Sequence, residues 1–274
     1  MNELQHIVAD LRTEGADLHR FLTTLDDADW SRPTRFKHWT IADVIAHLHF
    51  GDHLGITSHR DADEFRAFMA RVQDSGQPLV EFTRQWLQGA SGPPLLALWY
   101  DQFCTMCTLF ETSDPGLRLT WAGPSMGIRM FATARLMETW AHSWAIYDLL
   151  GISRPQRDHI RHIATIGART YGWSFANRGL PEPGPAPWLV LDAPSGARWE
   201  WHEPQPDNRI SGSAVEFCQV VTQVRNIADT GLEVVGEPAR AWMAIAQCFA
   251  GPPETPPAPG SRRLDPPPAP TGST

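Results

Sequence analysis

Lysine is almost absent from this chain, and no stretch of the sequence is strongly basic. Only Lys37 is a lysine among 23 basic residues, against 31 acidic residues, so the formal charge is −8. A protein that binds nucleic acid or an anionic membrane surface through bulk charge needs a basic surface. We therefore expect neither nucleic acid nor membrane as a partner.

Long apolar runs are also missing. The sequence has no run of about 18 apolar residues, which is the minimum for a membrane-spanning helix. Near the N-terminus, Glu3, Asp10, Glu14 and Asp17 stand where a signal peptide needs a positive end and an apolar middle. The sequence therefore predicts a cytoplasmic protein.

Cysteine is scarce, and several catalytic motifs are absent. Cys104, Cys107, Cys218 and Cys248 are too few and too scattered to predict a disulfide framework. The first two have redox spacing, but they lie in an apolar helical pattern with no strand before it, which favours cysteines buried in the core. Phosphate-binding glycine loops, Gly-x-Ser-x-Gly and His-Glu-x-x-His do not occur, which argues against nucleotide, serine-hydrolase and zincin chemistry.

Most of the first 178 residues follow helical periodicity. Apolar side chains recur every three or four positions in seven ranges: 2–25, 41–59, 62–73, 79–88, 95–111, 128–150 and 155–177. Thr40 and Asp43 have the spacing of a capping box, which predicts that the second helix begins at Ile41. Long helices joined by short connections predict an antiparallel bundle over residues 1–178.

A proline-dense linker at 179–187 precedes a stretch of different character. Patterns typical of strands and helices alternate there: strands at 188–191, 198–202 and 232–235, and helices at 214–225 and 239–249. Ser213 and Glu216 have capping-box spacing at the first of these helices. We expect a small α/β domain over 188–250, followed by a disordered tail over 251–274, whose composition offers almost nothing to bury.

Glu138 and His142 form the most informative pair in the sequence. Four residues apart on a helix, they project from one face and can both bind one divalent ion. They also lie on the inward stripe of that helix, where a carboxylate is costly to bury unless it has a partner. The alternative interpretation is a Glu–His ion pair without a metal.

The helix over 41–59 is unusually rich in histidine and offers a third ligand. His47, His49 and His53 lie there together with Asp52, and one histidine would complete a set of two histidines and one carboxylate. Periodicity does not select among them, because His49 lies nearer the apolar stripe than His47. His49 and His53 also form a pair of their own, four residues apart.

Two segments, WTIADVIAHL at residues 39–48 and RLMETWAH at residues 135–142, resemble the DinB-like superfamily. Within it, the chain looks most similar to mycothiol-dependent maleylpyruvate isomerases and to a group of actinobacterial-type metal-binding proteins, over residues 1–251. The resemblance implies an N-terminal DinB-like antiparallel helix bundle followed by a sterol-carrier-like α/β domain. It also implies a divalent ion bound by His47, Glu138 and His142, with Zn²⁺ as the first expectation and Ni²⁺ or another divalent ion as the alternative, and it alone selects His47 over His49.

The resemblance extends to one residue of the second domain. The isomerases have a functional arginine at the end of that domain's first helix, which carries over to Arg225 as a catalytic residue, or to Val224 if the match shifts by one position. Ala145 stands where relatives usually have an acidic residue. The uncertain match at Arg225 and the alanine at position 145 are both departures from the isomerases, and they argue against maleylpyruvate itself as the substrate.

The resemblance implies a metal-dependent isomerase or thiol transferase that acts on a small molecule with mycothiol as cosubstrate. The ion would activate a thiol or water, or polarise a carbonyl. Two alternatives stay open. One is a thiol-independent isomerase or cyclase of a specialised pathway, and the other is a non-catalytic protein that encloses an apolar ligand among its 12 tryptophans. Both a monomer and a homodimer are compatible with the sequence.

Overall fold

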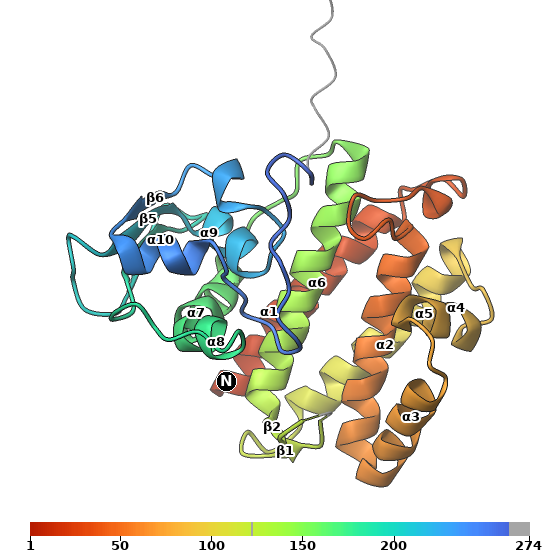
Figure 1. Cartoon of the computed structure of the whole chain (residues 1–274). Coiled ribbons are helices and arrows are strands. Elements are labelled where there is room, and N and C mark those ends of the chain that lie inside the picture. Colours follow the sequence, from red (N-terminus) through yellow and green to blue (C-terminus); the bar gives the residue numbers. More distant parts are fainter. Residues whose placement is uncertain (122, 263–274) are drawn as a thin grey trace, which may run out of the picture. The chain divides into compact units, whose positions relative to one another are not determined.

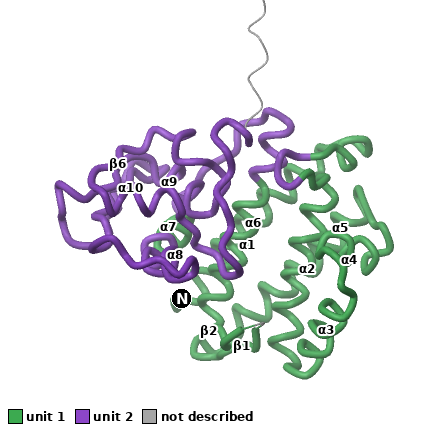
Figure 2. Tube along the Cα trace, viewed as in Figure 1, with its two compact units in different colours: residues 1–33, 38–143, 159–166 green, residues 34–37, 144–158, 167–274 purple. Residues whose placement is uncertain are grey.

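The chain divides into two compact units, which Figure 2 draws in different colours. The computed structural model describes residues 1–121 and 123–262. Unit 1 comprises Met1–Pro33, His38–Ser143 and His159–Ile166, and unit 2 comprises Thr34–Lys37, Trp144–Asp158 and the described chain from Gly167 onward. The predicted linker at 179–187 thus falls inside unit 2, and the predicted domain boundary stays a prediction.

Unit 1 is helical, as the periodicity predicts (Figure 1). Its elements are α1 (Glu3–Leu22), a short 3-10 turn (Asp29–Ser31), α2 (Ile41–Arg60), α3 (Ala62–Asp74), α4 (Leu79–Trp86), α5 (Gly92–Glu111), the two-residue strands β1 (Arg118–Leu119) and β2 (Met126–Gly127), most of α6 (Ile128–Leu150) and most of α7 (Arg161–Arg169). Helix α2 packs against α3, α4 and α5, and α5 also packs against α1. The bundle therefore surrounds α2, the helix with the high histidine density.

Local sequence explains where α2 begins. The Thr40 hydroxyl accepts from the Asp43 backbone N–H at 3.1 Å, and the Asp43 carboxylate accepts from the Thr40 backbone N–H at 2.8 Å. This reciprocal pair satisfies backbone donors that the first turn of a helix leaves without partners, so the predicted capping box is confirmed. Arg84 on α4 adds two bonds of 2.6 Å to the same carboxylate, which fixes the start of α2 against α4.

Unit 2 contains a small mixed sheet. Its strands β3 (Trp188–Asp192), β4 (Arg198–Trp201), β5 (Arg209–Ser213) and β6 (Glu233–Val235) lie in the order β4-β3-β5-β6. Strand β3 is antiparallel to β4 and parallel to β5, and β5 is antiparallel to β6. The helices of this unit are α8 (Tyr171–Ala176), α9 (Ala214–Val221) and α10 (Glu237–Met243). A helical bundle followed by a small α/β unit is the predicted fold class, and the structure confirms it.

Three predicted helices of the second half are shorter than their patterns indicate. The helix expected over 155–177 begins with a 3-10 turn (Asp158–Ile160), continues as α7 (Arg161–Arg169) and breaks before α8, where the Thr170 hydroxyl bonds the Gly167 carbonyl at 2.9 Å. Helix α9 ends at Val221 rather than 225, because Gln223 adopts a left-handed backbone (φ 58°). Helix α10 ends at Met243 rather than 249.

One further expectation for unit 2 was wrong, and one of its strands was not predicted. Ser213 precedes α9 but makes no capping bond through its side chain, and Glu216 instead accepts from the Gly231 backbone N–H at 3.1 Å. The sequence analysis also missed strand β5, whose only large apolar residue is Ile210. A strand with so little alternation becomes a strand through pairing with β3 and β6, which no local pattern reveals.

The chain after Gly251 differs from the expected disorder as far as residue 262. Glu254 donates its backbone N–H to Gln247, Asn226 donates to the Pro257 carbonyl at 2.8 Å, and Gly260 donates to Asp229 at 2.8 Å. Polar side chains of unit 2 thus hold this segment, although it buries little apolar surface itself. The rest of the predicted tail, residues 263–274, lies outside the described residues. No helix in the described residues is long and apolar enough to cross a membrane.

Candidate metal centre

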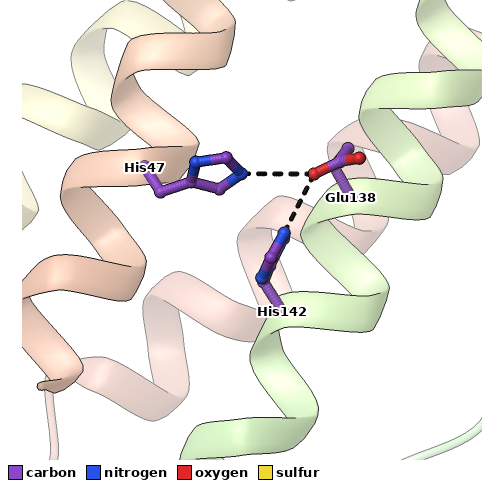
Figure 3. A group of neighbouring side chains, drawn as sticks. All are labelled: His47, Glu138 and His142. Carbon is purple, nitrogen blue, oxygen red and sulfur yellow. Dashed lines mark hydrogen bonds and ion pairs between the residues drawn. The ribbon is translucent and has the colours of Figure 1, made fainter. Parts of the chain in front are cut away.

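Three side chains from two helices of unit 1 converge on one point (Figure 3). His47 comes from α2, whereas Glu138 and His142 stand one helical turn apart on α6. Glu138 Oε2 lies 3.3 Å from His47 Nε2 and 3.0 Å from His142 Nε2. The structure therefore brings together the three residues that the sequence analysis named as metal ligands.

The spacing of these atoms fits a metal ion. One ligand atom from each residue lies within 4.8 Å of the others, and the described residues contain one such group. A four-coordinate ion with bonds of about 2.1 Å holds its ligand atoms about 3.4 Å apart, close to the two distances above. The side chains of His47, Glu138 and His142 are 21%, 26% and 15% exposed. The group is thus partly open, as a site that binds a water or substrate must be.

The charges at this point also suit a cation. Burial, together with the nearby charge of His142, lowers the pKa of His47 to about 4, so its imidazole is neutral near pH 7. Burial acts to raise the pKa of Glu138, but hydrogen bonds from His142 and His47 outweigh it and hold that pKa well below the ordinary value. An ionised carboxylate beside neutral imidazole is the protonation state that a metal ion requires.

The two ring nitrogens of His47 have different surroundings. His47 Nδ1 is buried and has no hydrogen-bond partner in the described part of the chain. The His47 ring therefore meets the group through its other nitrogen, Nε2, which lies toward Glu138. The donor set of two imidazole nitrogens and one carboxylate oxygen is one that zinc and nickel accept, so the residues present fit a divalent ion.

Trp39 forms one side of the group. Its ring lies 5.2 Å from the His47 ring and stacks on the His142 ring at 6.1 Å with an interplanar angle of 13°. Trp39 immediately precedes Thr40, the N-cap of α2, so the capping box fixes the backbone next to Trp39. Trp39 was not among the residues predicted for the site, and its position directly before the N-cap of α2 was the available signal.

The other polar residues of α2 lie elsewhere. His49 packs beside Trp86 at 5.4 Å, and burial together with the charge of His53 lowers its pKa to about 4. His53 packs against Phe68 at 4.6 Å. Asp52 is fully buried and bonds Arg135 on α6. In the structure His47, and not His49, therefore meets Glu138.

Arg225 lies in unit 2, four residues after the end of α9. Its guanidinium bonds Asp148 at 2.6 Å and the Val224 carbonyl at 3.1 Å, and it lies 5.2 Å from the centre of the Trp144 ring. Only 2% of Arg225 is exposed, so this arginine is well ordered by its neighbours. Its catalytic role stays a prediction.

The cysteines have the expected core character. Cys107, Cys218 and Cys248 are buried, Cys104 is half-buried, and none of the four forms a disulfide. Burial raises the pKa of Cys107 and of Cys218, so these thiols stay protonated. Neither Cys107 nor Cys218 is therefore a candidate for a catalytic thiolate.

Comparisons with known proteins show the family and the fold of this chain. The family model of the mycothiol maleylpyruvate isomerase N-terminal domain matches residues 11–147. Two proteins described as uncharacterized, from Mycobacterium tuberculosis strains CDC 1551 / Oshkosh and ATCC 25618 / H37Rv, are each 38% identical over 247 residues, which is 90% of this chain and 96% of theirs.

Solved structures show the same fold. The crystal structure of a mycothiol-dependent maleylpyruvate isomerase matches with a TM-score of 0.55 at 17% identity, covering 79% of this chain and 88% of that one. A structure of that isomerase with a histidine-to-alanine substitution matches with a TM-score of 0.52 at 16% identity, over the same shares of the two chains. From the matched domain and the M. tuberculosis relatives together, the chain belongs to the mycothiol maleylpyruvate isomerase N-terminal domain family.

Proposed function

We propose that this protein is a divalent-metal-dependent enzyme of the mycothiol-dependent isomerase or transferase type, with His47, Glu138 and His142 as the metal ligands. The observation that carries the proposal is the convergence of one carboxylate oxygen and two imidazole nitrogens within 4.8 Å. A divalent ion held there would lower the pKa of a thiol or water and polarise a substrate carbonyl. Zinc and nickel suit this donor set best.

The chain's own residues would prepare the site in three ways. Glu138 supplies the negative charge that a cation needs, and neutral His47 offers a nitrogen lone pair without competing for a proton. Trp39 covers the rings of His47 and His142 on one side, which limits the approach of water from there. The partial exposure of all three ligand side chains leaves room for a small molecule.

The family to which the chain belongs is the reason for proposing mycothiol as a cosubstrate. The matched solved structure is of a mycothiol-dependent isomerase, which supports a thiol cosubstrate for this chain but does not identify its substrate. A cytoplasmic location is part of the proposal, because the four cysteines are too few and too scattered in the sequence to predict a disulfide framework. Arg225 stays the proposed catalytic residue through the resemblance to the isomerases, and its bond to Asp148 holds its guanidinium in one orientation.

The thiol part of the proposal has a direct spectroscopic test. Protein loaded with Co²⁺ is titrated with mycothiol, and with S-methyl mycothiol as the matched control. A thiolate that binds the ion gives an intense sulfur-to-cobalt charge-transfer band, which we expect with mycothiol and not with the methylated form. Absence of the band with both compounds would reject thiol activation and favour a thiol-independent isomerase or cyclase.

A further inference from the structure

A buried arginine ties together the two helices that carry the proposed metal ligands. The Arg135 guanidinium of α6 donates through Nε to Asp52 Oδ1 of α2 at 3.0 Å. One of its terminal nitrogens donates to the Leu48 carbonyl, also on α2, at 3.1 Å. Arg135 is 6% exposed and Asp52 is fully buried. We call these contacts the Arg135–Asp52 brace.

Both oxygens of the Asp52 carboxylate in the brace have hydrogen-bond partners. The second oxygen of Asp52 accepts from the Trp99 indole N–H of α5 at 3.1 Å. A buried carboxylate is tolerated only when its oxygens have partners, and here arginine and indole supply them. The arrangement fixes the rotation of α2 relative to both α6 and α5, because each bond needs a defined direction.

Gly51 makes room for the guanidinium. A Cβ atom at this position would lie 2.2 Å from one terminal nitrogen of Arg135 and 2.6 Å from its central carbon. Glycine inside a helix weakens that helix, and α2 has glycine here nonetheless. The close approach of the guanidinium to the α2 backbone accounts for it.

The brace lies about one helical turn from the proposed metal ligands. On α2 it holds Leu48 and Asp52, one and five residues after His47, and on α6 Arg135 stands three residues before Glu138. A shift of one residue along a helix moves a side chain by about 1.5 Å and rotates it by about 100°. Metal–ligand distances tolerate only about 0.2 Å, so the register of the two helices decides whether three ligands can share one ion.

Buried ion pairs seldom stabilise a fold more than apolar packing of equal volume, and their best attested use is to specify one register. We propose that Arg135 is a positioning residue that sets the register of α2 against α6, so that His47 meets Glu138 and His142 in the geometry of a metal site. This inference rests on the proposed metal function. It assigns to Arg135 and Asp52 a role that neither the ligand set nor the fold alone requires.

The test uses the full chain, with Co²⁺ as the probe. Arg135→Met is compared with Arg84→Met, which removes a guanidinium that forms two bonds of 2.6 Å from α4 to Asp43 of α2. Supporting residues around metal ligands typically change metal affinity by about 10- to 100-fold. We expect such a loss in Arg135→Met, with an altered visible spectrum at saturating Co²⁺, and an unchanged affinity and spectrum in Arg84→Met.

A purely structural role predicts a different result. In that case Arg135→Met lowers the thermal midpoint, but its Co²⁺ spectrum at saturation matches the wild type, and the inference is overturned while the metal function stands. If the wild type itself binds no Co²⁺, the proposed function fails and this inference fails with it. Should Arg135→Met not fold, Arg135→Lys replaces it. Lysine keeps the charge beside Asp52 without the planar fork, so we expect a folded protein with weaker Co²⁺ binding and a changed spectrum.

Discussion

Glu138 Oε2 lies 3.3 Å from His47 Nε2, although 91 residues separate the two side chains in the sequence. The same oxygen lies 3.0 Å from His142, only four residues away on α6. Helix geometry alone brings Glu138 and His142 together on α6. His47 joins them only because α2 packs against α6. The proposed function depends on this one long-range contact.

Removal of the charge of Glu138 alone tests its role as a ligand. Glu138→Gln keeps the shape of the side chain but loses the anion, so we expect metal affinity to fall by at least about 100-fold, since a neutral amide is a poor ligand for zinc. The folded apoprotein should persist, because burial of a carboxylate is costly in itself. Competition with a coloured chelator measures the affinity.

The matched control for this variant is Glu14→Gln. Glu14 is also buried and bonds a histidine, His159, at 2.8 Å, within the same unit. The control should lose stability and retain the wild-type metal affinity. Equal loss of affinity in both variants would mean that general destabilisation, and not a missing ligand, explains the result for Glu138.

Trp39 should orient the two histidine rings. Aromatic contacts of this kind contribute about 0.5–1.5 kcal/mol, so we expect Trp39→Ala to weaken metal binding by about tenfold at most. Trp39→Phe keeps a ring against His47 and His142 and should recover most of the affinity. Isothermal titration with zinc measures both variants. Equal affinities for alanine and phenylalanine would contradict an orienting role for the ring.

The two capping boxes read from the sequence predict opposite results. Thr40 makes its capping bond to Asp43, so Thr40→Ala should lower the free energy of unfolding by about 1 kcal/mol. Ser213 makes no such bond through its side chain, and Ser213→Ala should change stability by less than about 0.5 kcal/mol. Urea unfolding followed by circular dichroism measures both. A larger loss at Ser213 than at Thr40 would contradict the structure.

The stability of the metal-free protein should fall in mild acid. The pKa of His47 is lowered from 6.5 to about 4 by burial and the charge of His142, and that of His49 is lowered equally by burial and the charge of His53. Between about pH 6.5 and about pH 4 the unfolded chain binds a proton at each of these histidines and the folded chain does not. The free energy of unfolding therefore decreases as the pH falls. The loss is about 3 kcal/mol for each of the two histidines.

Asp52 acts in the opposite direction over part of this range. Burial raises its pKa to about 6, so the folded chain takes up a proton before the unfolded chain does and gains stability as the pH falls. Two histidines outweigh one aspartate, and the net slope stays downward. Unfolding in the presence of a chelator, from about pH 7 to about pH 4.5, should give a shallower slope for His49→Gln than for the wild type. Parallel slopes would contradict the assignment.

Local patterns were enough to predict the helical unit and half of the site. The spacing of Glu138 and His142 on one helix, and the capping box that begins α2, are both visible over a few residues, and the structure confirms both placements. The choice of His47 over His49 was not accessible in this way. It depends on how α2 is rotated against α6, which the family resemblance supplied and the Arg135–Asp52 brace explains physically.

The features of the fold that the sequence did not predict also depend on contacts between residues far apart in the chain. Strand β5 has little alternation of its own and exists because β3 and β6 pair with it. Helix α10 stops at Met243 because later backbone groups bond elsewhere, with Cys248 donating to the Val221 carbonyl at 2.8 Å. The segment over residues 251–262 is ordered by polar side chains far away in sequence, such as Asn226. None of these contacts has a local sequence pattern.

The metal content of the purified protein decides whether His47, Glu138 and His142 hold an ion. Plasma mass spectrometry is applied to the wild type and to His142→Ala, each after reconstitution with zinc or nickel and removal of loosely bound ions. We expect about one ion per wild-type chain and almost none in the variant, because two remaining ligands hold a divalent ion poorly. A wild-type protein without metal, or a variant that retains it, would contradict the account.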